Sequence, residues 1–129
     1  MLLLLSALNT FAADVDTVKT YSASMKKEIK AVVVTPASYK DGNRFPVVYL
    51  LHGYSGNYAD WIKKVPAIKD LADQYQLMIV CPDGNFSSWY FDSPIDSAIR
   101  YESYITKELI PFIDANFKTK ADPKYRAIT

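Results

Sequence analysis

The chain has 129 residues, of which 50% are hydrophobic, and its formal net charge is +1. This length suits one domain with a hydrophobic core and is too short for two. So small a net charge gives no strong field to recruit nucleic acid or an anionic membrane, and we predict neither as a partner. The single cysteine, Cys81, excludes an internal disulfide and a cysteine-based metal site, and we interpret it as a small buried hydrophobe.

The first segment, residues 1–13, begins with the apolar run MLLLLSAL and continues with small residues before the first acids. The run is too short to span a bilayer and is typical of a secretory signal peptide. Thr10 and Ala12 provide the small side chains that signal peptidase needs if it cuts after Ala12. We therefore predict an exported protein, periplasmic or secreted, without stable membrane insertion. A buried N-terminal helix or strand is the alternative interpretation.

Strand and helix patterns follow the leader in a regular order. Residues 17–36 contain two runs with a period of two, which is typical of strands, and residues 37–46 are rich in turn formers. The run VVYLLHG, residues 47–53, is continuously apolar, as expected for a parallel strand that is buried on both faces. A helical spacing then covers residues 65–76, and residues 77–82 form a second apolar strand.

The second half of the chain repeats this alternation. Residues 83–96 form a loop that is rich in aromatic and small polar residues. Apolar spacing predicts a helix from residue 98 to 117, which Pro111 should kink or divide, and YRAIT at 125–129 starts a third parallel strand. A hairpin followed by alternating strands and helices predicts an α/β fold, with an open, mostly parallel sheet and helices on both faces.

Two loops form the candidate site, because such sheets bind ligands beyond the carboxyl ends of their strands. In the first loop, HGYSGN, Gly53 and Gly56 allow a sharp turn and a close approach to a substrate. A main-chain N–H there could face the oxygen that becomes negative in an acyl-transfer transition state. A tight turn that merely ends the strand is the alternative interpretation.

The second loop offers aromatic pocket walls and hydroxyl donors. These residues are Trp89, Tyr90, Phe91, Ser87 and Ser88. Each aromatic side chain could instead fold back onto the core. Asp92 and Asp96 are interpreted as turn caps rather than calcium ligands, because two carboxylates without further oxygen ligands make a poor calcium site. We predict no metal and no cofactor.

The obvious nucleophile candidate is Ser55, in a sequence close to Gly-x-Ser-x-Gly. Asn57 replaces the final glycine, and no helix is expected to follow at once, as a nucleophile elbow requires. The only histidine, His52, ends a strand, where we expect its side chain to brace the turn. The chain is therefore expected to lack a Ser–His–acid triad.

Four blocks of the chain together resemble a known family. The blocks are VVYLLHGYSGNYADW, LMIVCPDGNFSSWYFDSP, YESYITKELIPFIDANF and YRAIT. In order and spacing they resemble the esterase family of α/β-hydrolases that includes esterase D (S-formylglutathione hydrolase), tributyrin and feruloyl esterases and the mycolyltransferase antigens. The resemblance covers residues 21–129. It implies an α/β-hydrolase fold truncated before the nucleophile elbow, with residues 14–129 as the N-terminal part of a single domain and the triad beyond Thr129.

The resemblance also implies roles for particular residues. Tyr54 would lend its backbone N–H to the oxyanion hole, and His52 and Gly53 would shape that loop. Ser88, Trp89 and Tyr90 would contact the substrate. The implied activity is that of a serine carboxylesterase that cleaves a small-molecule or saccharide ester through an acyl-enzyme, with this part inactive alone. A non-catalytic truncated binding module and an acyltransferase of the same family are the alternatives.

Overall fold

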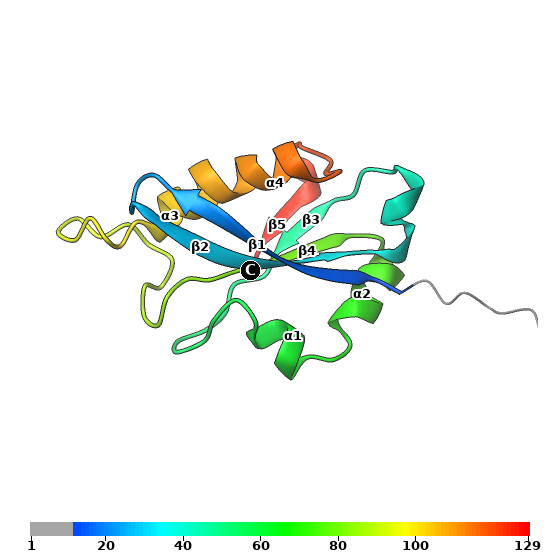
Figure 1. The fold of residues 1–129 in the computed structure, drawn as a ribbon, viewed down its shortest axis with the longest axis horizontal. Coiled ribbons are helices and arrows are strands. Elements are labelled where there is room, and N and C mark those ends of the chain that lie inside the picture. Colours follow the sequence, from blue (N-terminus) through cyan, green and yellow to red (C-terminus); the bar gives the residue numbers. More distant parts are fainter. Residues whose placement is uncertain (1–11) are drawn as a thin grey trace, which may run out of the picture.

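A five-stranded sheet, in the order β1-β2-β4-β3-β5, organises the computed structural model, which describes residues 12–129 (Figure 1). The strands are β1 (Asp14–Ser22), β2 (Lys27–Thr35), β3 (Val47–Tyr49), β4 (Met78–Pro82) and β5 (Arg126–Ile128). β2 runs antiparallel to both β1 and β4, whereas β3 runs parallel to both β4 and β5. The parallel half of this mixed sheet carries the predicted strand–helix–strand alternation. All but the last two residues of the predicted leader lie outside the described residues.

Helices cover both faces of the sheet, as predicted (Figure 1). On one face lie α1 (Asp60–Lys64) and α2 (Ile68–Tyr75), and on the other lie α3 (Tyr101–Ser103), the π-helical segment η2 (Tyr104–Leu109) and α4 (Ile110–Asn116). Two short 3-10 helices, η1 (Ala37–Asp41) and η3 (Pro123–Tyr125), precede β3 and β5. The spacing of apolar residues predicted α2 and the long C-terminal helix. It did not predict α1, because so short a helix shows no repeat.

The C-terminal helix changes its hydrogen-bond register just before Pro111. Residues 104–109 form a π-helix between two α-helical parts. Proline has no N–H, and its ring clashes with the carbonyl four residues earlier, here that of Lys107, so a regular α-helical turn is disfavoured there. Pro111 was predicted to kink or divide the helix; the structure instead shows an unbroken helical run from 101 to 116 with a π-helical change of register before the proline. Within the π-helical segment, Glu108 accepts hydrogen bonds from Ser22 Oγ at 2.6 Å and from Ser24 N–H at 2.9 Å, which holds the hairpin turn.

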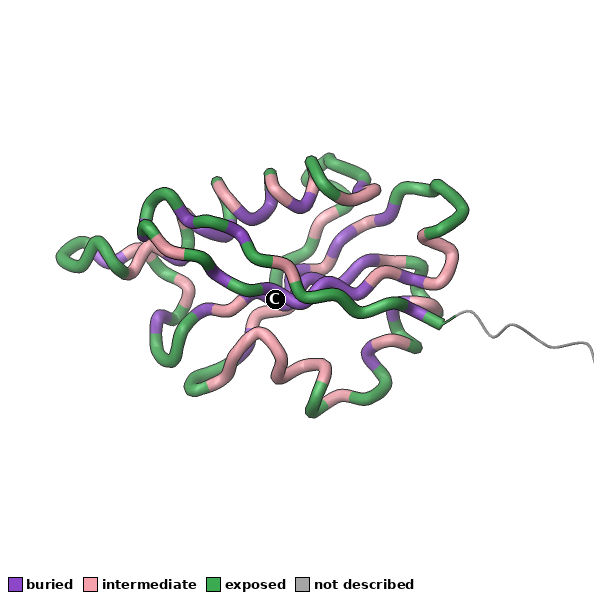
Figure 2. Tube along the Cα trace, in the orientation of Figure 1, coloured by how far each residue is buried: buried purple, intermediate pink, exposed green. Residues whose placement is uncertain are grey.

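Two apolar clusters join the layers, one on each face of the sheet. Figure 2 marks in purple the buried positions along the chain. Val33 belongs to the cluster under α3 and α4, whereas Val32 and Val34 belong to the cluster under α2. This alternation along β2 is the period of two that the sequence predicted. Cys81 lies in the second cluster, and burial raises the pKa of its thiol to about 12. The interpretation of Cys81 as a buried hydrophobe is confirmed.

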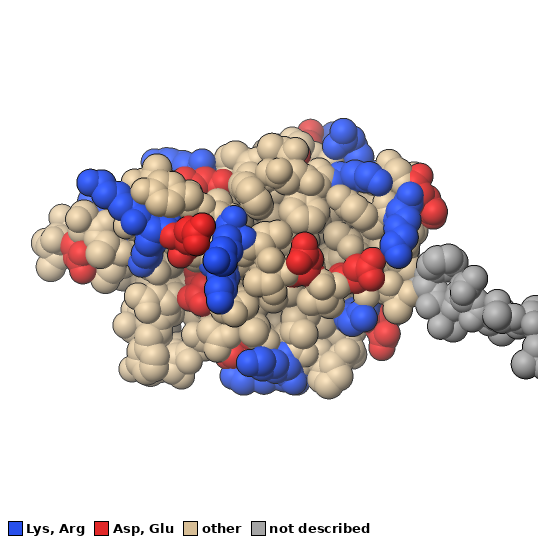
Figure 3. All heavy atoms as spheres, viewed as in Figure 1, with Lys and Arg blue, Asp and Glu red and all other residues tan. Residues whose placement is uncertain are grey.

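Charged side chains are mixed in sign over the face shown in Figure 3, where basic and acidic groups alternate. This distribution fits the net charge of +1 and leaves no one-signed patch on that face. Within residues 12–129, no helix combines the length and the apolar character that crossing a membrane requires.

One edge of the sheet leads to a prediction about self-association. Within the described residues β5 pairs only with β3, and Ile128 on this strand is 47% exposed. Open apolar edges invite pairing between chains. We expect the 129-residue chain on its own to self-associate, and Ile128→Lys to reduce this association without loss of secondary structure. Sedimentation velocity over a concentration series measures the effect.

The control is Leu71→Lys, which places the same charge on an exposed apolar residue of α2, away from the edge. A wild-type chain that stays monomeric at every concentration would contradict the prediction, as would equal effects of the two variants.

Candidate active site

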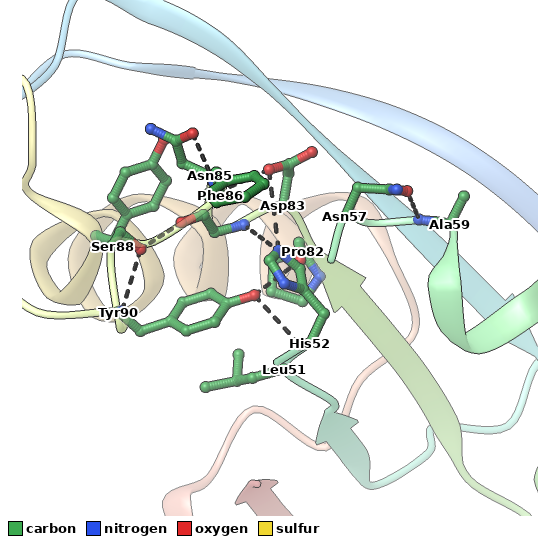
Figure 4. Close-up of polar contacts among 12 residues, drawn as sticks. Leu51, His52, Asn57, Ala59, Pro82, Asp83, Asn85, Phe86, Ser88 and Tyr90 are labelled. Carbon is green, nitrogen blue, oxygen red and sulfur yellow. Dashed lines mark hydrogen bonds and ion pairs between the residues drawn. The ribbon is translucent and has the colours of Figure 1, made fainter. Parts of the chain in front are cut away.

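Two loops meet beyond the carboxyl ends of β3 and β4 and enclose a cleft of about 150 Å³ (Figure 4). His52, Gly53 and Tyr54 line one side, and residues 84–90 line the other. The cleft lies at the sheet edge where α/β proteins bind their ligands. Five of the predicted site residues, His52, Gly53, Ser88, Trp89 and Tyr90, therefore share one cleft with the sixth, Tyr54.

The His52 side chain joins the two loops. Its Nδ1 lies 2.8 Å from the carbonyl oxygen of Gly53, which can only accept, so Nδ1 carries the proton. Its Nε2 accepts the N–H of Gly84 at 2.8 Å. This neutral tautomer makes no ion pair with Asp83, although Oδ1 of that residue lies 4.0 Å from Nε2. His52 is only 8% exposed, and both nitrogens of its side chain are used to hold the loops together.

The backbone of the first loop leaves two N–H groups unused. His52 N–H donates to Tyr90 Oη, Ser55 N–H to Phe86 O and Gly56 N–H to Gly53 O. Within residues 12–129, the N–H groups of Gly53 and Tyr54 have no hydrogen-bond partner, and both residues line the cleft. Most backbone donors in proteins are paired, so two adjacent free donors at a cleft are available for a ligand.

Helix α1 supports this loop from behind. The indole N–H of Trp61 donates to the carbonyl of Leu51 at 3.0 Å. Asn57 Oδ1 accepts the N–H of Ala59 at 2.9 Å, just before α1 begins (Figure 4). A Cβ atom on Gly56 would come within 2.9 Å of both His52 Nδ1 and Asp60 Oδ2, so only glycine fits this turn. Sequence reasoning missed the role of α1; Trp61, the last residue of NYADW, was the available signal.

Ser55, the rejected nucleophile candidate, lies on the exposed side of the loop. Its φ is +60°, in the left-handed region, and its N–H is bound to Phe86 O at 2.8 Å. Among residues 12–129 no hydrogen bond joins its hydroxyl to His52, and α1 begins only at Asp60. This geometry lacks the serine–base contact and the immediate helix of a nucleophile elbow.

The second loop is held by its own hydroxyl and amide groups. Ser88 is buried, and its hydroxyl donates to the carbonyl of Gly84 and accepts the N–H of Tyr90 at 3.1 Å. Trp89 and Tyr90 both have φ of +54°, which costs about 1–2 kcal/mol for a bulky L-residue. Two consecutive residues in this region, held at a cleft, are typical of functional loops.

Three aromatic rings form an exposed cluster at the cleft mouth. The ring of Tyr54 lies edge-on to Phe86, with centroids 4.9 Å apart, and is stacked on Trp89 at 6.0 Å. Tyr54 is 61% exposed and Trp89 is 73% exposed. Sequence reasoning named Trp89 and the backbone of Tyr54 but missed Phe86, whose place in an aromatic loop was the only signal.

Two carboxylates hold the end of the second loop. Asp92 accepts hydrogen bonds from Ser103 N–H at 3.0 Å and Ser103 Oγ at 2.6 Å, and these bonds lower its pKa. Asp96 Oδ1 accepts the N–H of Ala98 at 2.8 Å. The interpretation as a turn cap is confirmed for Asp96 and is wrong for Asp92, which ties the loop to α3 instead. Among residues 12–129, no group of three or more His, Cys, Asp or Glu side chains is placed to hold a metal ion.

Comparisons with known proteins identify the family of this chain. The family model described as Putative esterase matches residues 22–129. An esterase of Mycobacterium tuberculosis (strain H37Rv) is 33% identical over 100 residues, which cover 74% of this chain and 22% of that protein. The chain therefore spans about a fifth of the length of this relative.

Solved structures show the same fold. A ferulic acid esterase superposes with a TM-score of 0.79 at 26% identity, over 92% of this chain and 48% of that one. An S-formylglutathione hydrolase from Agrobacterium tumefaciens superposes with a TM-score of 0.78 at 23% identity, over 96% of this chain and 50% of that one. The prediction of an α/β-hydrolase fold is confirmed.

The two glycines on opposite sides of the cleft give a matched pair of substitutions. A Cβ on Gly84 would overlap the Tyr90 ring, whereas a Cβ on Gly53 would meet nothing within 4 Å. We expect Gly84→Ala to lower the free energy of unfolding by about 1–3 kcal/mol, as overpacking does, and Gly53→Ala to change it by less than about 0.5 kcal/mol. Urea denaturation measures both. Equal effects would show that the Tyr90 ring does not rest on Gly84.

Proposed function

Since this chain belongs to the esterase family whose model matches residues 22–129, we propose that it forms the oxyanion-hole part of a serine carboxylesterase. The unpaired N–H of Tyr54 at the cleft is the observation that carries the proposal. In ester hydrolysis the carbonyl oxygen becomes negative when a serine attacks the carbonyl carbon. One main-chain donor aimed at that oxygen lowers the activation free energy by about 3 kcal/mol.

The nucleophile is proposed to lie at the carboxyl end of β5. Leu51 N–H donates to Thr129 O at 2.7 Å, and Thr129 N–H donates to Tyr49 O at 3.0 Å. β5 thus runs beside β3 up to the start of the first loop, residues 52–57, which we call the oxyanion loop. A serine on a turn that continues from β5 would lie close to the free N–H of Tyr54, as an acyl-enzyme mechanism requires.

Neither Ser55 nor His52 is proposed to belong to the triad. Both nitrogens of His52 are occupied by backbone groups, and Ser55 has no hydrogen bond to it among residues 12–129. The proposed triad is supplied by residues outside this range, so that residues 12–129 alone are inactive. Without a triad, a positioned substrate gains at most about 10³–10⁴-fold over water.

The proposed substrate is a small-molecule or saccharide ester. The cleft, with the aromatic cluster of Tyr54, Phe86 and Trp89 at its mouth, suits a flat or ring-shaped group. Trp89 and Tyr90 are proposed as its walls, and Ser88 contributes through the loop that it holds. A non-catalytic binding module is the second candidate, favoured by an exposed aromatic cluster beside a cleft. An acyltransferase would use the same oxyanion hole and differ in its acceptor.

Chemical labelling of the complete gene product tests the proposed mechanism. We expect a fluorophosphonate to label a serine outside residues 12–129, and Ser55→Ala to change hydrolysis of p-nitrophenyl acetate by less than about twofold. Tyr54→Pro, which removes the donor, should lower kcat by about 10²–10³-fold. Mass spectrometry of the labelled peptide and steady-state kinetics measure these outcomes.

Tyr54→Ala is the matched control, because it removes the ring and keeps the N–H. It should raise KM and leave most of kcat. Labelling at Ser55, or equal losses of kcat in the two Tyr54 variants, would refute the assignment. The absence of any labelled serine would favour the binding module, and transfer of acetate to a sugar faster than to water would favour the acyltransferase.

Export is a second part of the proposal. Ala13 is buried, and its N–H donates to Asp73 Oδ2 at 3.0 Å, so Ala13 belongs to the folded domain. We propose cleavage after Ala12, because the new α-ammonium group of Ala13 could still donate to the Asp73 carboxylate. This moves the domain boundary one residue before the predicted residue 14.

N-terminal sequencing of the protein recovered from envelope and medium tests this proposal. We expect the sequence to begin at Ala13, and Asp73→Asn to lower the melting temperature of the processed protein more than Asp70→Asn does. Asp70 is an exposed residue of the same helix and serves as the control. Recovery of a cytosolic protein that retains Met1 or Leu2 would contradict export.

A further inference from the structure

The hydrogen-bond ladder between β3 and β4 is interrupted at the cleft. Leu50 N–H donates to Val80 O at 2.8 Å, and a parallel ladder advances by two residues on each strand. The next rung would join His52 N–H to Pro82 O. Pro82 has no N–H, so it cannot return a bond to Leu50, and the two strands are free to diverge at this point.

The phenol hydroxyl of Tyr90 occupies the missing rung. His52 N–H donates to Tyr90 Oη at 3.3 Å, and Tyr90 Oη donates to Pro82 O at 3.2 Å (Figure 4). One hydroxyl thus replaces a direct backbone bond and keeps both backbone groups paired. Because the hydroxyl stands between the strand ends, they are further apart than a direct bond would hold them.

The rest of the loop holds this hydroxyl in place. Gly84 provides the space in which the Tyr90 ring lies, since any Cβ there would overlap the ring. The ring also makes edge contacts with His52, at 5.5 Å between centroids, and with Tyr101, at 6.4 Å. Burial raises the pKa of the Tyr90 phenol, which keeps its donor proton in place.

We propose that Tyr90 is a positioning residue that sets the direction of the oxyanion loop by separating the ends of β3 and β4. The proposal rests on the proposed esterase function. His52 immediately precedes Gly53 and Tyr54, whose N–H groups are free. The position of the His52 backbone therefore determines where the N–H of Tyr54 lies. Without the hydroxyl, His52 N–H can bond directly to Pro82 O, which draws the loop toward β4 and away from the substrate oxygen.

Tyr90→Phe in the complete gene product tests the proposal, because it keeps the ring and removes only the hydroxyl. We expect kcat for p-nitrophenyl acetate to fall about 10- to 100-fold, since a misplacement of about 1 Å can cost 100-fold in rate. KM should stay within about threefold, because the walls of the cleft are retained. Tyr101→Phe is the matched control: its hydroxyl accepts Lys27 Nζ at 3.0 Å, away from the strand ends, and its kcat should change by less than about twofold.

Amide NMR separates this inference from the proposed function. In Tyr90→Phe the His52 amide should shift and change its hydrogen exchange rate, whereas in Tyr101→Phe it should not. If the wild-type protein hydrolyses no ester, the proposed function fails, and the amide result alone decides the placement of the hydroxyl. Tyr90→Phe with an unchanged His52 amide, or with lower thermal stability and an unaltered kcat, overturns the proposal.

Gly84→Ala, which displaces the ring and keeps the hydroxyl, provides a second test if Tyr90→Phe does not fold. It should also lower kcat, and an unaltered kcat overturns the proposal.

Discussion

The cleft depends on the two hydrogen bonds that the neutral imidazole of His52 makes. The ring accepts a backbone N–H from one loop and donates to a backbone carbonyl in the other. A side chain that does both can join two loops without burying a charge, and burial of an unpaired charge is very costly. Neither lysine, which only donates, nor an ionised carboxylate, which only accepts, could make this pair of bonds. The position of the free donors in the first loop therefore follows from the tautomer of one ring.

The exposed aromatic cluster at the cleft mouth has a cost in stability that other contacts of its loop offset. The Tyr54 ring contacts those of Phe86 and Trp89, all three residues are exposed, and the backbone of Trp89 is in a left-handed conformation. Exposed apolar surface and a strained backbone both reduce stability, so the remaining contacts of the loop must compensate. Asp92 closes the loop on Ser103, and Ser88 closes it on Gly84. The loop is thus tied to the fold by hydrogen bonds and presents exposed apolar rings at the mouth of the cleft.

The sequence predicted those parts of the fold in which burial alone decides the structure. β2 and β4 are apolar along their buried stretches, and the spacing in α2 marks its inner face. α1 was not predicted, because the contact of Trp61 with Leu51 holds it rather than a periodic pattern. The site was predicted as two loops and one backbone donor. Its central bond could not be predicted, because His52 and Gly84 are 32 positions apart and Gly84 contributes only an N–H.

The same limit applies to the second loop. The resemblance to esterases predicted that Ser88, Trp89 and Tyr90 contact the substrate, but it could not show which atoms remain free. The hydroxyls of Ser88 and Tyr90 are bound to backbone groups, whereas the ring of Trp89 faces outward. Such choices depend on distances between groups that are brought together only by the folded sheet.

The π-helical turn in the C-terminal helix affects how the helix responds to a change in its number of residues. A π-helical turn holds one residue more than an α-helical turn, so everything beyond it is rotated by about 100° relative to an uninterrupted α-helix. Glu108 reaches the β1–β2 turn from this segment, while Ile113 beyond it faces the core. Deleting a single residue between 104 and 109 would remove this extra residue and restore a continuous α-helix in which the flanking parts keep their present orientation. A one-residue deletion should therefore be better tolerated in this segment than in α4, where it would turn every later side chain by about 100°.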